Sequence, residues 1–189
     1  MAVVKLGQKA VNKAVEVLIS GGIVIFPTDT VYGFLSDAGN KKAVNRIFKI
    51  KKRAKNHPLP VFVSSIKKAK ELAQISRQQE KILKKYWPGK YTFVLNRMQG
   101  TNLYGLDKKT IALRIPKYKF LNILLKKIKS PLIQTSVNVS GKSPLNKIDD
   151  IIKQFSQEDV LIVDGGNVKN NKSSKIIDLR GSNIKIIRK

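Results

Sequence analysis

Side chains suited to binding anions gather in three segments of this sequence. An apolar, β-branched run at residues 23–26 leads directly into Pro-Thr-Asp-Thr-Val-Tyr-Gly at residues 27–33. A basic segment follows at residues 51–57, and a loop rich in Ser, Asn and Gly occupies residues 136–144. Hydroxyl, amide and cationic groups at the ends of strands are typical of a ligand crevice in an open sheet. They favour a site that positions phosphates and stabilises charge at phosphorus.

Other kinds of site have less support in the sequence. Thr, Asp, Ser and Asn also form ordinary side-chain turns, so each loop taken singly has a purely structural explanation. The tripeptide Gly141-Lys142-Ser143 resembles the end of a phosphate-binding P-loop, but Ser136 occupies the position of the required first glycine. The chain has one histidine, His57, and no cysteine. We find no nucleophile elbow and no metal-ligand spacing, so neither a protein nucleophile nor a protein-bound metal is expected.

The apolar periodicity predicts an α/β protein in the broad sense. Helical spacing predicts helices over residues 8–20, 41–50, 66–73, 76–86, 119–128 and 148–155. Strands are predicted over residues 23–26, 60–63, 91–95, 111–115, 132–135, 160–163, 175–179 and 184–187. No repeat or linker interrupts the pattern, so residues 1–189 are expected to form one domain. The last strands follow one another too closely for helical crossovers, which predicts a mixed sheet with some antiparallel pairs.

The charge is strongly positive. There are 38 Lys and Arg residues against 12 Asp and Glu, a formal net charge of +26. Such a field attracts polyanions, including tRNA and nucleotides. Abundant Lys, Ile and Asn also indicate a composition bias, which is an alternative source of the excess. No apolar run approaches the length of a membrane span and no signal peptide is recognisable, so no membrane association and a cytoplasmic location are expected.

The ordered motifs resemble those of the YrdC family over about residues 10–188. They are PTDTVYG, RIFKIKKR, HPLPVFV, YWPGKYTFVL, TIALRIP, SVNVSG and KIIDLR. The resemblance implies a twisted mixed sheet flanked by helices around a deep basic cavity. It also implies a nucleotidyltransferase that makes L-threonylcarbamoyladenylate and pyrophosphate from L-threonine, bicarbonate (or carbon dioxide) and ATP. The product serves threonylcarbamoyladenosine formation in tRNA, and Mg²⁺ is expected to bind chiefly through ATP.

Site residues follow from the resemblance, motif by motif. The catalytic K-x-R and S-x-N signatures correspond to Lys51, Arg53, Ser136 and Asn138. The expected contacts to L-threonine come from Thr30, Arg114 and Ser174. The expected contacts to ATP come from Arg53, His57, Thr110, Ser136, Ser143 and Arg188. Chemically, the cations can neutralise triphosphate charge, and Arg114 offers a bidentate fork for a carboxylate.

The sequence departs from the family pattern at several positions. Phe62 stands where longer members carry a threonine-contacting histidine, and Ala54 replaces a proline. Val137 replaces the alanine of the S-x-N signature, and Lys175 replaces the threonine of a Ser-Thr pair. The chain ends at Lys189, so the extra C-terminal domain of the longer subgroup is expected to be absent. These features favour the short, TsaC-like subgroup.

Two other functions stay open at this point. A non-catalytic RNA-binding module of the same fold would use the same basic cavity, and a related carbamoyl-transfer or regulatory domain is the second alternative. The presence of both signature pairs favours the synthase. Contact with tRNA or double-stranded RNA through the basic surface, and a downstream threonylcarbamoyl transferase, are the expected macromolecular partners.

Overall fold

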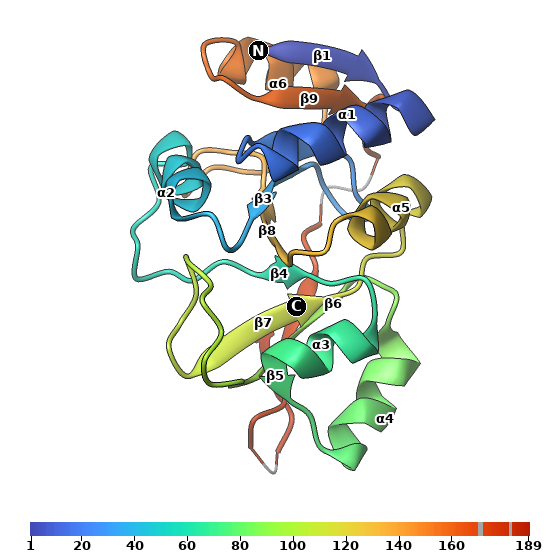
Figure 1. The fold of residues 1–189 in the computed structure, drawn as a ribbon, viewed down its shortest axis with the longest axis vertical. Coiled ribbons are helices and arrows are strands. Elements are labelled where there is room, and N and C mark those ends of the chain that lie inside the picture. Colours follow the sequence, from blue (N-terminus) through green and yellow to red (C-terminus); the bar gives the residue numbers. More distant parts are fainter. Residues whose placement is uncertain (170–171, 182) are drawn as a thin grey trace.

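A single mixed sheet organises the computed structural model, which describes residues 1–169, 172–181 and 183–189. Within that part of the chain the strand order is β1-β9-β2-β3-β8-β4-β7-β6-β10-β11, with β5 paired to β6 (Figure 1). The elements in chain order are β1 (Ala2–Lys5), α1 (Gln8–Ile19), β2 (Val24–Phe26), β3 (Gly33–Asp37), α2 (Lys41–Ile50), β4 (Val61–Phe62), α3 (Ile66–Leu72), β5 (Ala73–Gln74), α4 (Arg77–Tyr86), β6 (Tyr91–Arg97), β7 (Thr110–Arg114), α5 (Lys119–Lys127), β8 (Leu132–Ser136), α6 (Ile148–Phe155), β9 (Leu161–Asp164), β10 (Lys175–Asp178) and β11 (Lys185–Arg188).

Both strand directions occur, as the sequence predicted. The pairs β1–β9, β2–β9, β4–β7 and β6–β10 are parallel. The pairs β2–β3, β3–β8, β4–β8, β6–β7, β5–β6 and β10–β11 are antiparallel. The mixed α/β fold with antiparallel pairing near its C-terminal strands is therefore confirmed.

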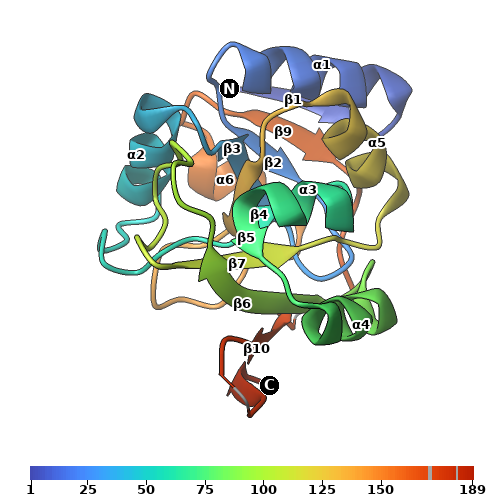
Figure 2. The ribbon, with the colours of Figure 1, turned by 60° about the horizontal axis from the view of Figure 1, so that its bottom comes forward.

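Helices cover the two faces of the sheet unequally. Adjacent residues of a strand point to opposite faces, so Val61 joins the hydrophobic cluster of α2, α3, α4 and α6, whereas Phe62 joins the cluster of α1 and α5. Figure 2 shows α1 and α5 side by side over one end of the sheet. On the α1/α5 face, β7, β6 and β10 are left without a covering helix. This uncovered half of the face is available for a site.

Local sequence explains where the helices begin. Asn40 caps α2 by accepting a hydrogen bond from the Ala43 amide, and Ser76 and Gln79 form a reciprocal capping box at the start of α4. All six predicted helices lie within one residue of the observed ones. None of the helices in the described ranges is both long and apolar enough to cross a bilayer.

The strand predictions missed three elements. β1 and the two-residue β5 were not predicted, and residue Gly33 was assigned to a loop although it begins β3. β3 lies in the middle of the sheet between β2 and β8, and its residues Gly33–Ser36 are buried. Its pairing with β8 brings the end of the PTDTVYG segment beside Ser136.

Candidate active site

A cavity of about 280 Å³ lies on the uncovered half of the α1/α5 face. Its floor includes Ala112 of β7, Val94 of β6 and Ile176 of β10, which project to this face because their strand neighbours pack in the opposite cluster. Polar residues from loops and strand ends surround this apolar floor. Six residues assigned from the sequence are among those that line it: Thr30, Arg53, Arg114, Ser136, Ser174 and Arg188.

Strand register explains why these distant segments meet. Ile176 pairs with Thr92 of β6 and with Arg188 of β11. The antiparallel register of β6 and β7 places Thr92 beside Arg114. The row across β7, β6, β10 and β11 therefore reads Arg114, Thr92, Ile176 and Arg188, so two cations and a hydroxyl share one line of the sheet with a single apolar residue.

Arg114 is the most enclosed cation of the cavity, with 1% of its side chain exposed. Its Nη2 atom donates to Oδ1 of Asp29, its Nη1 atom to Oγ1 of Thr30 at 3.1 Å, and its Nε atom to the Gly89 carbonyl at 2.9 Å. A guanidinium has five N–H donors, so two remain for a ligand. The buried ion pair and the two neutral acceptors hold the fork in one orientation.

The Thr30 hydroxyl has a defined polarity. Thr28 Oγ1 donates to the Val31 carbonyl at 2.7 Å, which uses its only proton. In the 3.0 Å contact between Thr28 Oγ1 and Thr30 Oγ1, Thr30 is therefore the donor. Thr30 Oγ1 also accepts from Arg114. Its remaining lone pair makes it an acceptor toward the cavity, suited to an ammonium or hydroxyl group of a ligand.

Tyr32 anchors the other side of the same loop. Its hydroxyl accepts from the Gly165 amide at 2.9 Å and donates to the Gly166 carbonyl at 2.7 Å. Burial raises the pKa of Tyr32 to about 12. The hydroxyl therefore stays neutral and can accept one hydrogen bond while it donates the other. The loop after β2 is thereby fixed to the segment after β9.

Lys51 lies outside the cavity lining, beneath the S-x-N segment. Its Nζ atom donates to the Ser136 carbonyl, to the Asn138 carbonyl at 2.9 Å and to Asn138 Oδ1 at 2.8 Å. These three acceptors use all three ammonium protons. Burial, with a smaller effect from the charge of Arg53, lowers the pKa of Lys51 to about 7. In this arrangement Lys51 fixes the loop, and its assignment as a catalytic residue stays a prediction.

Asn138 connects Lys51 to Ser136. Its Oδ1 atom accepts from Ser136 Oγ at 2.7 Å as well as from Lys51, and its Nδ2 atom donates to the Lys142 carbonyl. The Ser140 amide donates to the Lys51 carbonyl at 2.8 Å. Of the S-x-N pair, Ser136 reaches the cavity, and Asn138 supports it from behind.

Arg53 and Arg188 form a cationic end of the cavity. Arg53 donates through Nε to the His57 carbonyl at 2.9 Å, and Arg188 donates through Nε and Nη2 to the Ser174 carbonyl at 2.9 and 2.7 Å. Neither has a carboxylate partner among the described residues. Burial lowers the pKa of both guanidinium groups, and the charge of Arg53 lowers that of Arg188 further. Two uncompensated cations that line one cavity favour an anionic ligand.

Three residues assigned to ATP lie outside the cavity lining. The His57 and Ser143 side chains belong to exposed residues. Thr110 lines a neighbouring pocket of about 240 Å³, where its Oγ1 donates to Asp107 Oδ1 at 3.1 Å. That pocket shares Pro58, Val94, Ala112 and Ile187 with the cavity, so the two adjoin. The assignment of these three residues to ATP stays a prediction.

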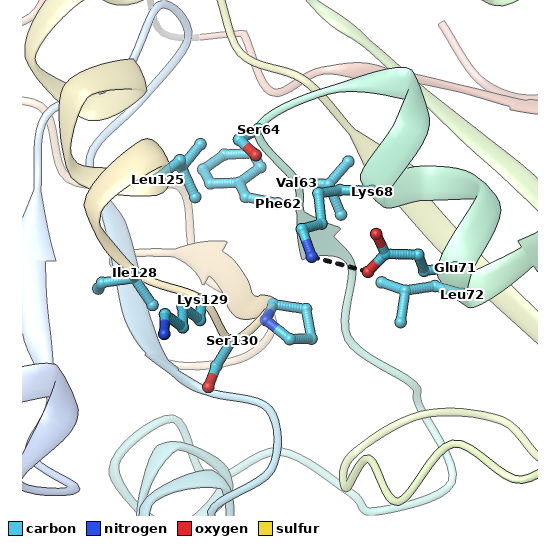
Figure 3. A pocket seen from close by; sticks show the side chains of 11 residues that line it. Phe62, Val63, Ser64, Lys68, Glu71, Leu72, Leu125, Ile128, Lys129 and Ser130 are labelled. Carbon is cyan, nitrogen blue, oxygen red and sulfur yellow. Dashed lines mark hydrogen bonds and ion pairs between the residues drawn. The ribbon is translucent and has the colours of Figure 1, made fainter.

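Phe62 is fully buried, and its ring lies 5.5 Å from the Arg114 guanidinium carbon. It supports that cation from the sheet through a cation–π contact. The ring also lines a separate pocket between α3 and α5, beside the Lys68–Glu71 ion pair (Figure 3). This second pocket encloses only about 40 Å³, room for about one or two water molecules. It is too small for a nucleotide.

A sequence model of the Sua5/YciO/YrdC family, described as "Telomere recombination", matches residues 16–189. The chain belongs to this family. One relative is the threonylcarbamoyl-AMP synthase of Pyrococcus abyssi, 33% identical over 163 residues, which are 84% of this chain and 47% of that protein. Another is a putative threonylcarbamoyl-AMP synthase of Methanocaldococcus jannaschii, 32% identical over 97% of this chain and 89% of that protein.

Solved structures of the Sua5/YciO/YrdC family share the fold. Pyrococcus abyssi Sua5 in complex with L-threonine superposes with a TM-score of 0.88 at 28% identity, over 99% of this chain and 56% of that one. Escherichia coli YciO gives a TM-score of 0.89 at 24% identity, over 100% of this chain and 94% of that one, and shows the fold alone. This chain thus spans about half of the Pyrococcus relative and nearly all of the shorter ones.

Sequence reasoning missed several residues of this cavity. Asp29 was recognised only as part of the PTDTVYG motif, and its pairing with Arg114 was not predicted. Gln134 lines the cavity as a buried residue, 8% exposed, and within the described chain its amide makes no hydrogen bond. The position of Gln134 two residues before Ser136 on one strand could have indicated a shared face. The apolar floor gave no such signal, because small and aliphatic strand residues are equally typical of a core.

Proposed function

We propose that this chain is an L-threonylcarbamoyladenylate synthase that uses L-threonine, bicarbonate and ATP. The observation that carries the proposal is that one cavity holds two chemically different sets of side chains. Thr30 and Arg114 provide an acceptor and a fork, and Arg53 and Arg188 provide uncompensated positive charge. An amino acid suits the first set and a triphosphate the second. Two curated relatives named threonylcarbamoyl-AMP synthase, one as putative, support the same reading.

The proposed reaction is a nucleotidyl transfer in two steps. The amino group of L-threonine attacks the carbon of bicarbonate, and loss of water leaves a carbamate. A carbamate oxygen then attacks the α-phosphorus of ATP, the bond from that phosphorus to the bridging oxygen breaks, and pyrophosphate leaves. Arg114 and Thr30 would hold the amino acid, while Arg53, Arg188 and Ser136 would stabilise charge on the phosphates. No protein nucleophile is required.

We assign Mg²⁺ to the nucleotide. None of the described residues that line the cavity is acidic, and no group of three or more His, Cys, Asp or Glu in the described chain could hold a metal ion. The cavity therefore lacks the oxygen ligands of a protein-held magnesium site. When bound with ATP, Mg²⁺ would neutralise phosphate charge, and the protein would contribute its arginines.

The wider role that we propose is supply of the adenylate for threonylcarbamoyladenosine formation in tRNA. A separate threonylcarbamoyl transferase would consume the product. The net charge of +26 supports contact with tRNA or double-stranded RNA through the surface. With these partners, we propose a cytoplasmic location for the activity.

Pyrophosphate release tests the proposal. The purified chain is incubated with ATP and Mg²⁺, and L-threonine or bicarbonate is omitted in turn. We expect release only when all three substrates are present, together with a mass-spectrometric signal for the adenylate. Release that ignores either L-threonine or bicarbonate would contradict the assignment.

A further inference from the structure

Asp29 joins two loops at the amino-acid end of the cavity. Its Oδ1 atom accepts from Arg114 Nη2, and its Oδ2 atom accepts from the Lys117 amide at 3.0 Å. The first contact links the loop after β2 to the end of β7, and the second links it to the segment that leads into α5. Only 8% of the Asp29 side chain is exposed, and of its two contacts the one to Arg114 is the more buried. The carboxylate is held from two sides.

Asp29 also makes the two ends of the cavity electrically different. Among the described residues, it is the carboxylate paired with a cavity arginine, because Arg53 and Arg188 donate only to carbonyl and hydroxyl oxygens. The Asp29–Arg114 pair carries no net charge, whereas Arg53 and Arg188 together carry about two positive charges. A triphosphate gains the most electrostatic binding energy from Arg53 and Arg188, whereas a zwitterionic amino acid, with no net charge, gains little from them.

We propose that Asp29 is a specificity-determining residue that sorts the two substrates by charge. By neutralising Arg114 it lets this end accept the carboxylate of a zwitterion through the two free N–H donors, and it makes the same end a poor site for phosphate. The inference rests on the proposed function, because it takes an amino acid and a nucleotide as the ligands. It adds a residue that excludes the wrong ligand from one end.

Binding of two probes to the Asp29→Asn variant tests the proposal. The probes are L-threonine and inorganic pyrophosphate, measured by titration calorimetry on the full chain. In the wild-type protein, saturating pyrophosphate should change the Kd for L-threonine less than about twofold, because the probes occupy different ends. In the variant, Arg114 becomes an unpaired cation, and pyrophosphate should compete with L-threonine and raise its apparent Kd at least about tenfold.

A double variant separates charge from loop structure. Asp29→Asn with Arg114→Gln restores neutrality without the fork, so it should lose L-threonine binding and gain no pyrophosphate binding. Glu80→Gln is the matched control, because Glu80 of α4 pairs with Lys84 of the same helix and with Lys70 of α3, and none of the three lines the cavity. Circular dichroism and melting temperature report whether each variant is folded. If the single variant does not fold, the double variant decides: a gain of pyrophosphate binding there overturns the proposal, and no gain supports it.

The outcomes are distinct. Unchanged competition in a folded Asp29→Asn protein, or competition already present in the wild type, would overturn the sorting role. Loss of L-threonine binding with no gain for pyrophosphate would do the same and would leave Asp29 as a loop anchor. A wild-type chain that binds both probes independently yet forms no adenylate would refute the proposed function alone, since binding needs no turnover.

Discussion

The Nζ atom of Lys51 lies 2.8 Å from Oδ1 of Asn138, and this hydrogen bond joins the two signature segments of the chain. Lys51 follows α2 directly, and Asn138 follows β8. Because Asn138 Oδ1 also accepts from Ser136 Oγ, the lysine sets the position of a cavity hydroxyl without reaching the cavity itself. Its influence on catalysis is therefore expected to include a large structural component.

Replacing Lys51 by Met should lower both stability and activity. The change leaves two carbonyl oxygens and one amide oxygen without their donor in a buried site, and we expect a loss of about 3 kcal/mol in the free energy of unfolding. Urea unfolding measures it. Lys49→Met is the control, because Lys49 is exposed on α2. Equal effects of the two substitutions would contradict the anchoring role.

The same lysine predicts a pH dependence of stability. Its pKa is about 7 in the folded protein against an ordinary value of 10.5, so between these values the unfolded chain binds a proton that the folded chain has lost. Stability should therefore rise with pH across this window by at most about 1.4 kcal/mol per unit. Between pH 7.5 and 9.5, the free energy of unfolding of the wild type should increase relative to that of Lys51→Met. Urea unfolding at each pH measures this difference. A difference that is constant with pH would exclude the lowered pKa.

Arg53→Gln should impair turnover more than any neighbouring change in the basic segment. Arg53 lines the cavity, so its loss removes a charge-stabilising donor at a cost of about 2–3 kcal/mol in kcat/KM. Lys55→Gln, at an exposed position, should have little effect. Steady-state pyrophosphate release measures both. Equal, mild losses at the two positions would instead indicate a solvated run of charge.

Gln134→Leu should weaken substrate binding and leave stability nearly unchanged. Gln134 lines the cavity, and its amide makes no hydrogen bond within the described chain, so the substitution removes a polar group of the cavity wall without breaking a hydrogen bond of the fold. Its Nε2 atom lies 3.1 Å from where a Cβ on Gly33 would be, which shows how closely it packs under the PTDTVYG loop. Thermal melting and substrate KM values test this. Gln74→Leu, at an exposed strand residue, should leave KM unchanged.

Adenylate formation should proceed without tRNA. All three substrates are small, and their proposed contacts come from this chain alone. If the charge of +26 is mainly compositional, tRNA binding should be weak, insensitive to sequence and steeply reduced by salt. Product formation with and without tRNA over a salt series measures both properties. A strict requirement for tRNA at low salt would contradict this prediction.

Periodicity predicted the helices well because each has a clear apolar stripe and, in α2 and α4, a side-chain cap. β3 was missed for a physical reason. It begins at a glycine inside a polar motif, and four of its five residues are buried between β2 and β8, so it shows no alternation. A strand of this kind is recognised by its partners, which the sequence alone does not show.

The site was predicted through residue types more than through their orientation. Arg114, Thr30 and Ser136 were expected at a ligand crevice, and they line one. Lys51 could not be distinguished from Arg53 in sequence, since both are cations two residues apart after the same helix. The packing of β8 against the end of α2 is what buries Lys51 under a loop and leaves Arg53 facing the cavity.

Strand β9 has a consequence for how the chain acquires this structure. β1, α1 and β2 are consecutive in sequence, yet β1 and β2 do not pair, because β9 lies between them and pairs with both. Roughly 140 residues separate that gap from the segment that fills it. During synthesis on the ribosome, two strand edges therefore stay open until residues 161–164 emerge. The N-terminal segment from β1 to β2 therefore forms a gap that only the late strand β9 can fill. Nascent chains are most exposed to mispairing of these two strand edges before β9 is synthesised.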